Sequence, residues 1–246
     1  MNHMVIGMGE VGKAIFDVLS CGVDYKVGWQ DVRSCEVPFN GRAHALHVAI
    51  PDSPNFVSNV RRYIDAYNPS IVIVHSTVPV GTCDANDWIH SPIRGVHPNI
   101  ARGIMTFVKY FGGLRSDEAA EIFSELGVNT VAIPMARDCE AAKLWDTTQY
   151  GWMIVLAKAI HAWCEANNAD FDFVYREFNR SYNEGYHAMG RPEVARPFLR
   201  HVPGPIGGHC VIPNLPLLGK NEITNFIEAF DRNMIIEDLR VSGEQQ

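Results

Sequence analysis

Short apolar segments alternate with amphipathic segments through the first half of the chain. Five apolar runs have the pattern of strands, and two of them, residues 44–51 and 70–77, are apolar enough to be buried on both faces, as parallel strands are. The other three are the segment before Gly7 and residues 25–31 and 128–134. Helical patterns fill the intervals, from the turn after Gly7 to about Gly22, over 55–69 and over 116–127. This alternation predicts an α/β fold with a Rossmann-type doubly wound parallel sheet.

The second half of the chain has a different pattern. From about Arg137 to Asn168 it contains no proline and a single interior glycine, which predicts one long helix. A second helical stretch covers residues 171–190, and a third lies near 222–233. We therefore expect two domains, an α/β domain over residues 1–136 and a mainly α-helical domain over 137–246.

Composition narrows the class of partner. The chain has 246 residues, of which 47% are hydrophobic, and a formal net charge of -7. The acidic balance and the absence of any long Lys/Arg run argue against nucleic acid or an anionic membrane and favour a small-molecule substrate. No apolar stretch approaches the roughly 18 residues of a membrane span, and the first motif begins at Gly7, which leaves no room for a signal peptide. We expect a cytoplasmic protein.

Cysteine and histidine spacing argues against a metal site. The six cysteines form no CxxC pair, and the ten histidines form no HExxH motif. The cysteines therefore have the pattern of reduced thiols, and we expect no bound metal.

A glycine-rich turn follows the first predicted strand. Residues 7–12 fit the pattern GxGxxG between a strand and a helix, which is the context that a dinucleotide-binding turn requires. The first glycine permits a tight turn, the second lets the backbone approach a pyrophosphate, and the third lets the helix pack closely. The N-terminus of the helix adds N–H groups for the phosphates. The expected cofactor-binding residues of this turn are Gly7, Met8, Gly9, Glu10, Val11 and Gly12.

An acidic residue at the end of the second predicted strand completes the pattern. Asp31 lies 19 residues after Gly12, where a carboxylate can accept hydrogen bonds from the adenosine ribose hydroxyls. The nearby Arg33 is of the type that holds a 2′-phosphate, but Asp31 would repel that phosphate, so the sequence favours NAD over NADP. The alternative is that the glycines only make a strand-to-helix turn and Asp31 only caps a loop.

Three further segments narrow the fold to a family. They are His75–Thr82 (HSTVPVGT), Glu140–Leu144 (EAAKL) and Pro203–Cys210 (PGPIGGHC). Taken in order with the glycine turn, they resemble the UDP-glucose/GDP-mannose dehydrogenase family, particularly its N-acetylmannosamine-type members. The resemblance spans roughly residues 3–235 and corresponds to the N-terminal NAD domain and the central helical region of that family.

The resemblance implies a reaction and a set of residues. In that family a primary alcohol of a nucleotide sugar is oxidised twice, with two NAD reduced and a cysteine carrying the intermediate. By resemblance, Cys210 would be this nucleophile, and Lys143 would steady a developing oxyanion. Thr77 would order water or the nicotinamide end of the cofactor. The remaining residues implied by the resemblance are Pro51 and Ser76 for the cofactor, and His97, Gly207, Gly208 and His209 for the substrate.

Three positions depart from the family pattern. Asn99 stands where the family has a catalytic Glu, Thr147 where it has an Asn, and Asn214 where it has an Asp. Because an amide is no general base near neutral pH, we expect thioester hydrolysis to be slow or the second oxidation to be absent. The sequence also ends near the point where the family's C-terminal, nucleotide-gripping domain would begin, so we expect that domain to be missing. All three residues remain candidates for the substrate site.

Three functions stay open at this point. The first is a minimal dehydrogenase that oxidises an alcohol or aldehyde through Cys210. The second is a two-electron dehydrogenase or reductase of a small hydroxy acid, with Lys143 or His97 in acid-base work and no covalent step. The third is a non-catalytic NAD-binding subunit. In each case we expect a homodimer, because the long helix carries more apolar surface than one small helical region covers, at Leu144, Trp152, Ile154, Val155 and Ile160.

Overall fold

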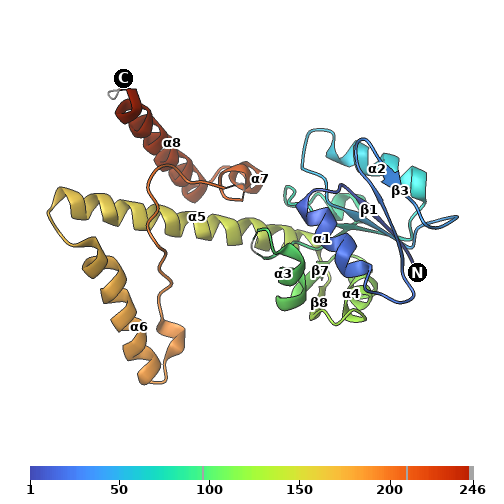
Figure 1. The fold of residues 1–246 in the computed structure, drawn as a ribbon, viewed down its shortest axis with the longest axis horizontal. Coiled ribbons are helices and arrows are strands. Elements are labelled where there is room, and N and C mark those ends of the chain that lie inside the picture. Colours follow the sequence, from blue (N-terminus) through green and yellow to red (C-terminus); the bar gives the residue numbers. More distant parts are fainter. Residues whose placement is uncertain (96, 209, 244–246) are drawn as a thin grey trace. The chain divides into compact units, whose positions relative to one another are not determined.

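The computed structural model describes residues 1–95, 97–208 and 210–243, and the chain forms two compact units (Figure 1). The first unit covers Met1–Lys143 and the second Leu144–Gln246. The long helix α5 (Ala136–Ala166) begins in the first unit and continues into the second. The domain boundary expected at residue 136 thus marks the start of α5, whereas the compact units divide inside that helix. His209 lies outside the described residues.

The first unit is built on one sheet. Within the described residues the sheet has eight strands in the order β3-β2-β1-β4-β5-β6-β7-β8. The strands are β1 (Asn2–Ile6), β2 (Lys26–Gln30), β3 (Cys35–Glu36), β4 (Ala45–Val48), β5 (Ile71–Val74), β6 (Ile89–His90), β7 (Lys109–Gly112) and β8 (Thr130–Ile133). β1 pairs in parallel with β2 on one side and β4 on the other, and β5 continues the parallel order. The sequence-based prediction of a Rossmann-type α/β fold is confirmed.

Helices cover both faces of this sheet, as the doubly wound prediction requires. They are α1 (Glu10–Leu19), α2 (Phe56–Tyr67), α3 (Ile100–Thr106) and α4 (Ser116–Ser124), with a short 3-10 turn η1 (Asp84–Asn86) between β5 and β6. Alternate β1 side chains point to opposite faces. Val5 packs in the cluster that contains buried residues of α1, α3 and α4, whereas Met4 and Ile6 pack with Phe56 and Val60 of α2.

Several elements of the first unit differ from the predicted pattern. The strands β3, β6 and β7 and the helix α3 were not expected, and the pairs β2–β3 and β6–β7 are antiparallel. Strands of two residues, such as β3 and β6, are too short to produce a periodic signal. In β7, the fully enclosed Lys109 interrupts the apolar pattern that marks a buried strand.

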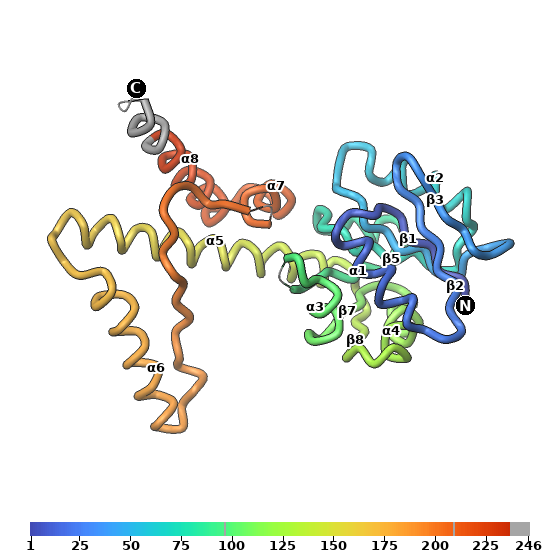
Figure 2. Tube along the Cα trace, in the orientation of Figure 1, coloured from blue at the N-terminus to red at the C-terminus, as the bar shows by residue number. Residues whose placement is uncertain are grey.

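The second unit is helical. It contains most of α5, a π-helical turn η2 (Asp172–Glu177), α6 (Phe178–Ala188), α7 (Leu215–Leu218) and α8 (Glu222–Gly243), with short 3-10 turns η3 (Pro192–Val194) and η4 (Ile212–Asn214). In Figure 2 the chain leaves α6 and returns toward α5 and α8 as an extended segment. A small core of Val155, Ile206, Val211, Leu215 and Ile227 joins α5, the returning segment, α7 and α8. The predicted mainly helical second region is confirmed.

Candidate cofactor and active site

The glycine turn has the backbone geometry that its sequence predicts. Gly7 follows β1 with φ +90°, and a Cβ there would lie 2.7 Å from the carbonyl oxygen of Ala49. A Cβ on Gly12 would lie 1.7 Å from the carbonyl oxygen of Gly7, so only glycine lets α1 pack onto the turn. By contrast, a Cβ on Gly9 would meet no atom within 4 Å. The turn is therefore closed at Gly7 and Gly12 and open at Gly9, which is exposed and precedes the first residue of α1.

Asp31 lies beside this turn. One carboxylate oxygen accepts the N–H of Met8 at 2.9 Å, and the other accepts the N–H of Val32 at 2.6 Å. The hydrogen bond from Val32, followed by that from Met8, lowers the pKa of Asp31 below its ordinary value, so the carboxylate is ionised at neutral pH. Each oxygen keeps acceptor capacity for a further donor, such as a ribose hydroxyl.

A hollow of about 350 Å³ opens next to Asp31. Its lining residues are Met8, Trp29, Asp31, Val32, Arg33 and Ser34. It combines one aromatic ring, one carboxylate and the open backbone of the turn, a set that fits the adenosine end of a dinucleotide. The residues present therefore fit NAD. The exposed Arg33 lines the same hollow, so the one feature that favours a 2′-phosphate lies beside the acid that opposes it.

The carboxyl ends of β4 and β5 bring the other expected cofactor residues to the same edge. Pro51 follows β4, and Ser76 and Thr77 follow β5. The hydroxyl of Ser76 donates to the carbonyl oxygen of Ile50 at 2.6 Å, which joins these two strand ends. Since Gly7 packs against Ala49, the glycine turn and the ends of β4 and β5 form one continuous edge of the first unit.

His97 also reaches this edge. Its Nδ1 lies 2.6 Å from Oε2 of Glu10, the first residue of α1, and both side chains are largely exposed. Asn99 is exposed at the position before α3 and makes no side-chain capping bond there. The structure thus brings His97 to the glycine turn, a contact for which the sequence has no signal.

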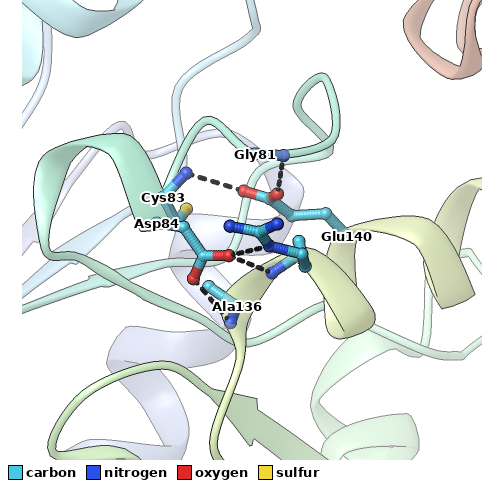
Figure 3. A network of polar contacts seen from close by, with 6 residues as sticks. Gly81, Cys83, Asp84, Ala136 and Glu140 are labelled. Carbon is cyan, nitrogen blue, oxygen red and sulfur yellow. Dashed lines mark hydrogen bonds and ion pairs between the residues drawn. The ribbon is translucent and has the colours of Figure 1, made fainter.

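A reciprocal pair of carboxylates connects the loop after β5 to the start of α5 (Figure 3). Glu140, which is completely buried, accepts the N–H of Gly81 at 2.5 Å and that of Cys83 at 2.8 Å. In the other direction, Asp84 accepts the N–H of Ala136 at 2.9 Å and forms an ion pair with Arg137 at 2.6 Å. Burial alone would raise the pKa of Asp84, but the hydrogen bonds from Arg137 and Ala136 outweigh it and lower that pKa. The sequence singled out neither carboxylate as functional.

Three buried histidines cross the sheet beneath this edge. His3 Nδ1 lies 3.2 Å from His47 Nε2, and His47 Nδ1 lies 3.2 Å from His75 Nε2. The row ends where His75 Nδ1 lies 2.9 Å from the carbonyl oxygen of Ser91. That last contact makes His75 Nδ1 the donor, and the same tautomer then follows for His47 and His3. Burial lowers the pKa of His3 to about 3 and holds those of His47 and His75 well below the ordinary value.

Two further buried bases lie close to this row. Lys109 Nζ is 3.4 Å from both His75 Nδ1 and the carbonyl oxygen of Ser91, and burial lowers its pKa to about 7. Burial likewise lowers the pKa of His90 to about 4, and its Nε2 lies 3.1 Å from the carbonyl oxygen of Ser76. The first unit therefore holds several buried bases whose pKa values burial lowers below their ordinary values.

Two of the three positions that depart from the pattern of the resembled family lie together in the second unit. Thr147 and Asn214 are both buried, and Asn214 Nδ2 donates to Thr147 Oγ1 at 3.4 Å. The Thr147 hydroxyl in turn donates to the carbonyl oxygen of Leu144 at 3.0 Å. The residues that depart from the family pattern therefore form a neutral pair, with neither side chain able to act as a general base.

Cys210 lies on an anchored loop of the second unit. Its thiol is exposed, as are the preceding Gly207 and Gly208. The buried ammonium of Lys158 donates to the carbonyl oxygens of Val202 and Gly204, and the buried Asp231 accepts the N–H of Ile206 at 2.5 Å. Lys143, on α5, is half-buried and is the last residue of the first unit.

The described residues contain neither a cluster that could hold a metal ion nor a helix that could span a membrane. Among the described residues, no three His, Cys, Asp or Glu side chains are grouped in a way that could hold a metal ion. In the same part of the chain, no helix combines the length and the apolar character needed to span a bilayer.

Comparisons with known proteins identify the fold. No protein-family model matches the chain, and no curated protein sequence does. Among solved structures, the UDP-D-ManNAc dehydrogenase of Pyrococcus horikoshii is similar with a TM-score of 0.75 and 14% identity, over 95% of this chain and 69% of that one. The UDP-N-acetyl-mannosamine dehydrogenase Cap5O of Staphylococcus aureus is similar with a TM-score of 0.71 and 17% identity, over 99% of this chain and 70% of that one.

A smaller dehydrogenase shares the same fold. The 3-hydroxyisobutyrate dehydrogenase of Mycobacterium tuberculosis is similar with a TM-score of 0.66 and 14% identity, over 92% of this chain and 90% of that one. At these identities the similarity concerns the fold. The resemblance that the sequence motifs predict is thus confirmed as a fold shared with nucleotide-sugar dehydrogenases, over about two thirds of their length.

Proposed function

We propose that the chain is an NAD-dependent dehydrogenase that acts on a CH–OH group. The observation that carries this proposal is the geometry of the glycine turn, which is open only at Gly9 and is flanked by the ionised Asp31. The solved structures that share the fold support it, since their names describe dehydrogenases of nucleotide sugars and of 3-hydroxyisobutyrate.

Different residues of the first unit would hold different parts of the cofactor. The N–H groups at the start of α1 would hold the pyrophosphate, and Asp31 would accept from the adenosine ribose. Pro51, Ser76 and Thr77 would line the nicotinamide half. We favour NAD over NADP because an ionised Asp31 would repel a 2′-phosphate despite Arg33. When bound, NAD supplies the hydride acceptor for the reaction.

Two residues are proposed to act on the substrate. The thiolate of Cys210 would add to the carbonyl carbon of an aldehyde and hold it as a thiohemiacetal, and Lys143 would donate to the oxygen on which negative charge develops. Gly207 and Gly208 would supply backbone donors for the substrate. Loss of a hydride from the thiohemiacetal carbon to NAD would leave a thioester on Cys210, and water would then cleave the C–S bond to release the acid and the thiol. Since Asn99, Thr147 and Asn214 offer no carboxylate to activate that water, we propose that this hydrolysis is slow.

A specific observation favours a second candidate. The chain covers 90% of the 3-hydroxyisobutyrate dehydrogenase structure, compared with 69% of the first nucleotide-sugar dehydrogenase. A two-electron dehydrogenase of a small hydroxy acid needs no covalent step, so Lys143 or His97 alone would serve as acid-base group and Cys210 would be dispensable.

We also propose a homodimer. Several large apolar side chains of the second unit are exposed, among them Trp145, Trp152, Leu156 and Trp163 of α5. Leu144 and Val155, which the sequence places among the apolar residues of the long helix, are instead buried within the chain, because they face the sides of α5 that the rest of the chain covers. The uncovered apolar surface of α5 therefore consists mainly of aromatic side chains, which are typical of interfaces.

One substitution separates the two catalytic candidates. NADH formation at 340 nm is measured for wild type, Cys210→Ser and Lys143→Met with alcohols, aldehydes and hydroxy acids. The covalent mechanism predicts that Cys210→Ser lowers kcat at least about 10³-fold with wild-type NAD binding, an effect of the size seen when a catalytic group is removed. Cys35→Ser, which removes an exposed thiol of the first unit, should have no effect.

Each other outcome has a meaning. Activity retained in Cys210→Ser and lost in Lys143→Met would overturn the covalent mechanism in favour of the hydroxy-acid dehydrogenase. Tight NAD binding with no turnover of any compound would indicate a non-catalytic NAD-binding subunit.

A further inference from the structure

The sheet topology predicts which half of the cofactor lies near which strand. The order β2-β1-β4-β5 places the glycine turn, after β1, between Asp31 on the β2 side and Ser76 and Thr77 on the β5 side. Ligands of such sheets lie across the carboxyl ends of the strands at this point. If Asp31 takes the adenosine half, the nicotinamide half must extend over β4 and β5. The segment after β5, residues 75–83, then forms its support.

This post-β5 segment is held at both ends. At its start, the N–H of His75 donates to the carbonyl oxygen of Val48 at 2.8 Å, and the Ser76 hydroxyl donates to Ile50. At its end, the N–H groups of Gly81 and Cys83 donate hydrogen bonds to the Glu140 carboxylate (Figure 3). Thr77 lies between the two anchors. Glu140 is therefore the side chain that fixes the far end of the segment.

The chemistry at Glu140 requires a carboxylate. Two backbone N–H groups converge on its two oxygens, and a completely buried charge is stabilised by such donors. A glutamine in the same place has only one acceptor oxygen, and its NH₂ group would face an N–H donor. Lys143 follows on α5 one turn later, so the same side chain joins the post-β5 segment to the turn of helix that carries Lys143.

We propose that Glu140 is a positioning residue for the nicotinamide half of the cofactor, acting through the post-β5 segment. This inference rests on the proposed function, because it requires that the first unit binds NAD. It assigns no contact between Glu140 and the cofactor. The proposal predicts a selective effect. Loss of the Glu140 hydrogen bonds should weaken the binding of ligands that reach the post-β5 segment and leave unchanged the binding of ligands that occupy only the adenosine end.

The test compares two probes on the full chain. NADH carries both halves of the cofactor, whereas ADP ends at the pyrophosphate and lacks the nicotinamide half. The dissociation constants of both are measured by calorimetry for wild type, Glu140→Gln and Glu140→Asp. We expect Glu140→Gln to raise the Kd of NADH about fivefold or more, with the Kd of ADP within twofold of wild type, since couplings between sites are typically of this size. Glu140→Asp, which keeps the charge but is one methylene shorter, should show a smaller shift.

Asp84→Asn is the matched control. It belongs to the same pair of carboxylates, but its hydrogen bonds go to Ala136 and Arg137 at the start of α5 and leave the N–H groups of Gly81 and Cys83 to Glu140, so it should lower the melting temperature and leave both dissociation constants unchanged. If Glu140→Gln does not fold, Glu140→Asp decides the question alone. If Glu140→Gln weakens the binding of both probes equally, or changes the binding of neither, the positioning role is overturned. Failure of wild type to bind either probe would instead overturn the proposed function.

Discussion

Gly9 and Gly12 of the glycine turn differ in what would restrict a side chain at each position. At Gly12 the limit lies within the protein, because a side chain would collide with the Gly7 carbonyl oxygen. At Gly9 the protein leaves open space and ordinary backbone angles, φ -65° and ψ -171°, so nothing in the chain itself requires a glycine there. Under the proposed function, the requirement for glycine at this position would come from the bound cofactor.

This difference predicts opposite behaviour of two alanine variants. Gly12→Ala should destabilise the first unit by at least about 2 kcal/mol, because overpacking against a backbone atom has no cheap relaxation. Gly9→Ala should stay within about 0.5 kcal/mol of wild type in stability. Its Kd for NADH should nevertheless rise about tenfold, because a methyl group would occupy the place of the pyrophosphate. Thermal melting and NADH titration of both variants check this, and unchanged NADH binding by Gly9→Ala would contradict the proposed site.

At the scale of elements, the sequence predicted the parallel strands and their helices but missed the features that depend on pairing. β1, β4 and β5 were visible as apolar runs, even though His3, His47 and His75 lie in or next to them. That these three side chains form one hydrogen-bonded row across neighbouring strands depends on the strand order, which no local pattern encodes.

The hydrogen bonds of Glu140 could not be predicted from the sequence for the same reason. Its partners Gly81 and Cys83 are 59 and 57 residues away in the chain. The motif around Lys143 included Glu140, but only the structure shows what it binds. The candidate site was therefore predictable where it follows strand ends, as at Gly9, Asp31 and Ser76, and unpredictable where distant segments meet.

The histidine row predicts an acid-sensitive first unit. When folded, His3, His47, His75 and His90 are neutral because burial lowers their pKa values, whereas in the unfolded chain they take up protons near pH 6.5. Between about pH 4 and 6.5 the unfolded state therefore binds more protons, and stability must fall as the pH falls. Lowered carboxylate pKa values, as at Asp31 and Asp84, act in the same direction but mainly below about pH 5.

Urea unfolding of wild type at pH 4.5, 5.5, 6.5 and 7.5 measures this dependence. We expect His3→Gln to flatten the slope by up to about 1.4 kcal/mol per pH unit, the contribution of one titrating group. A stability that is constant from pH 7.5 to 4.5 would contradict the assignment of a neutral row.

At the scale of the whole molecule, the second unit exposes apolar side chains that a single copy does not cover. A groove of about 570 Å³ is lined on α5 by Met153, Leu156, Ile160 and Trp163, and on η2 by Val174 and Tyr175. The uncovered aromatic residues extend beyond it, since Phe173 and Phe178 are both more than half exposed. Patches of this kind mark interaction surfaces in soluble proteins.

Light scattering at micromolar concentration tests the proposed dimer. Wild type should have twice the mass of one chain, and Trp163→Glu should shift the equilibrium to the monomer, because a charge would replace a ring at the exposed part of the groove. Leu114→Glu, a similarly exposed apolar position of the first unit, should leave the mass unchanged. A monomeric wild type would contradict the proposal.

NAD binding at the glycine turn is tested by a titration of the full chain with NADH, followed by the fluorescence of NADH, in wild type and Asp31→Ala. We expect saturable binding of one NADH per chain, weakened about tenfold or more when the Asp31 carboxylate is removed, since a hydrogen bond to a charged group is worth about 1.5–3 kcal/mol. Absence of saturable binding by wild type, or equal binding by Asp31→Ala, would contradict NAD binding at the glycine turn.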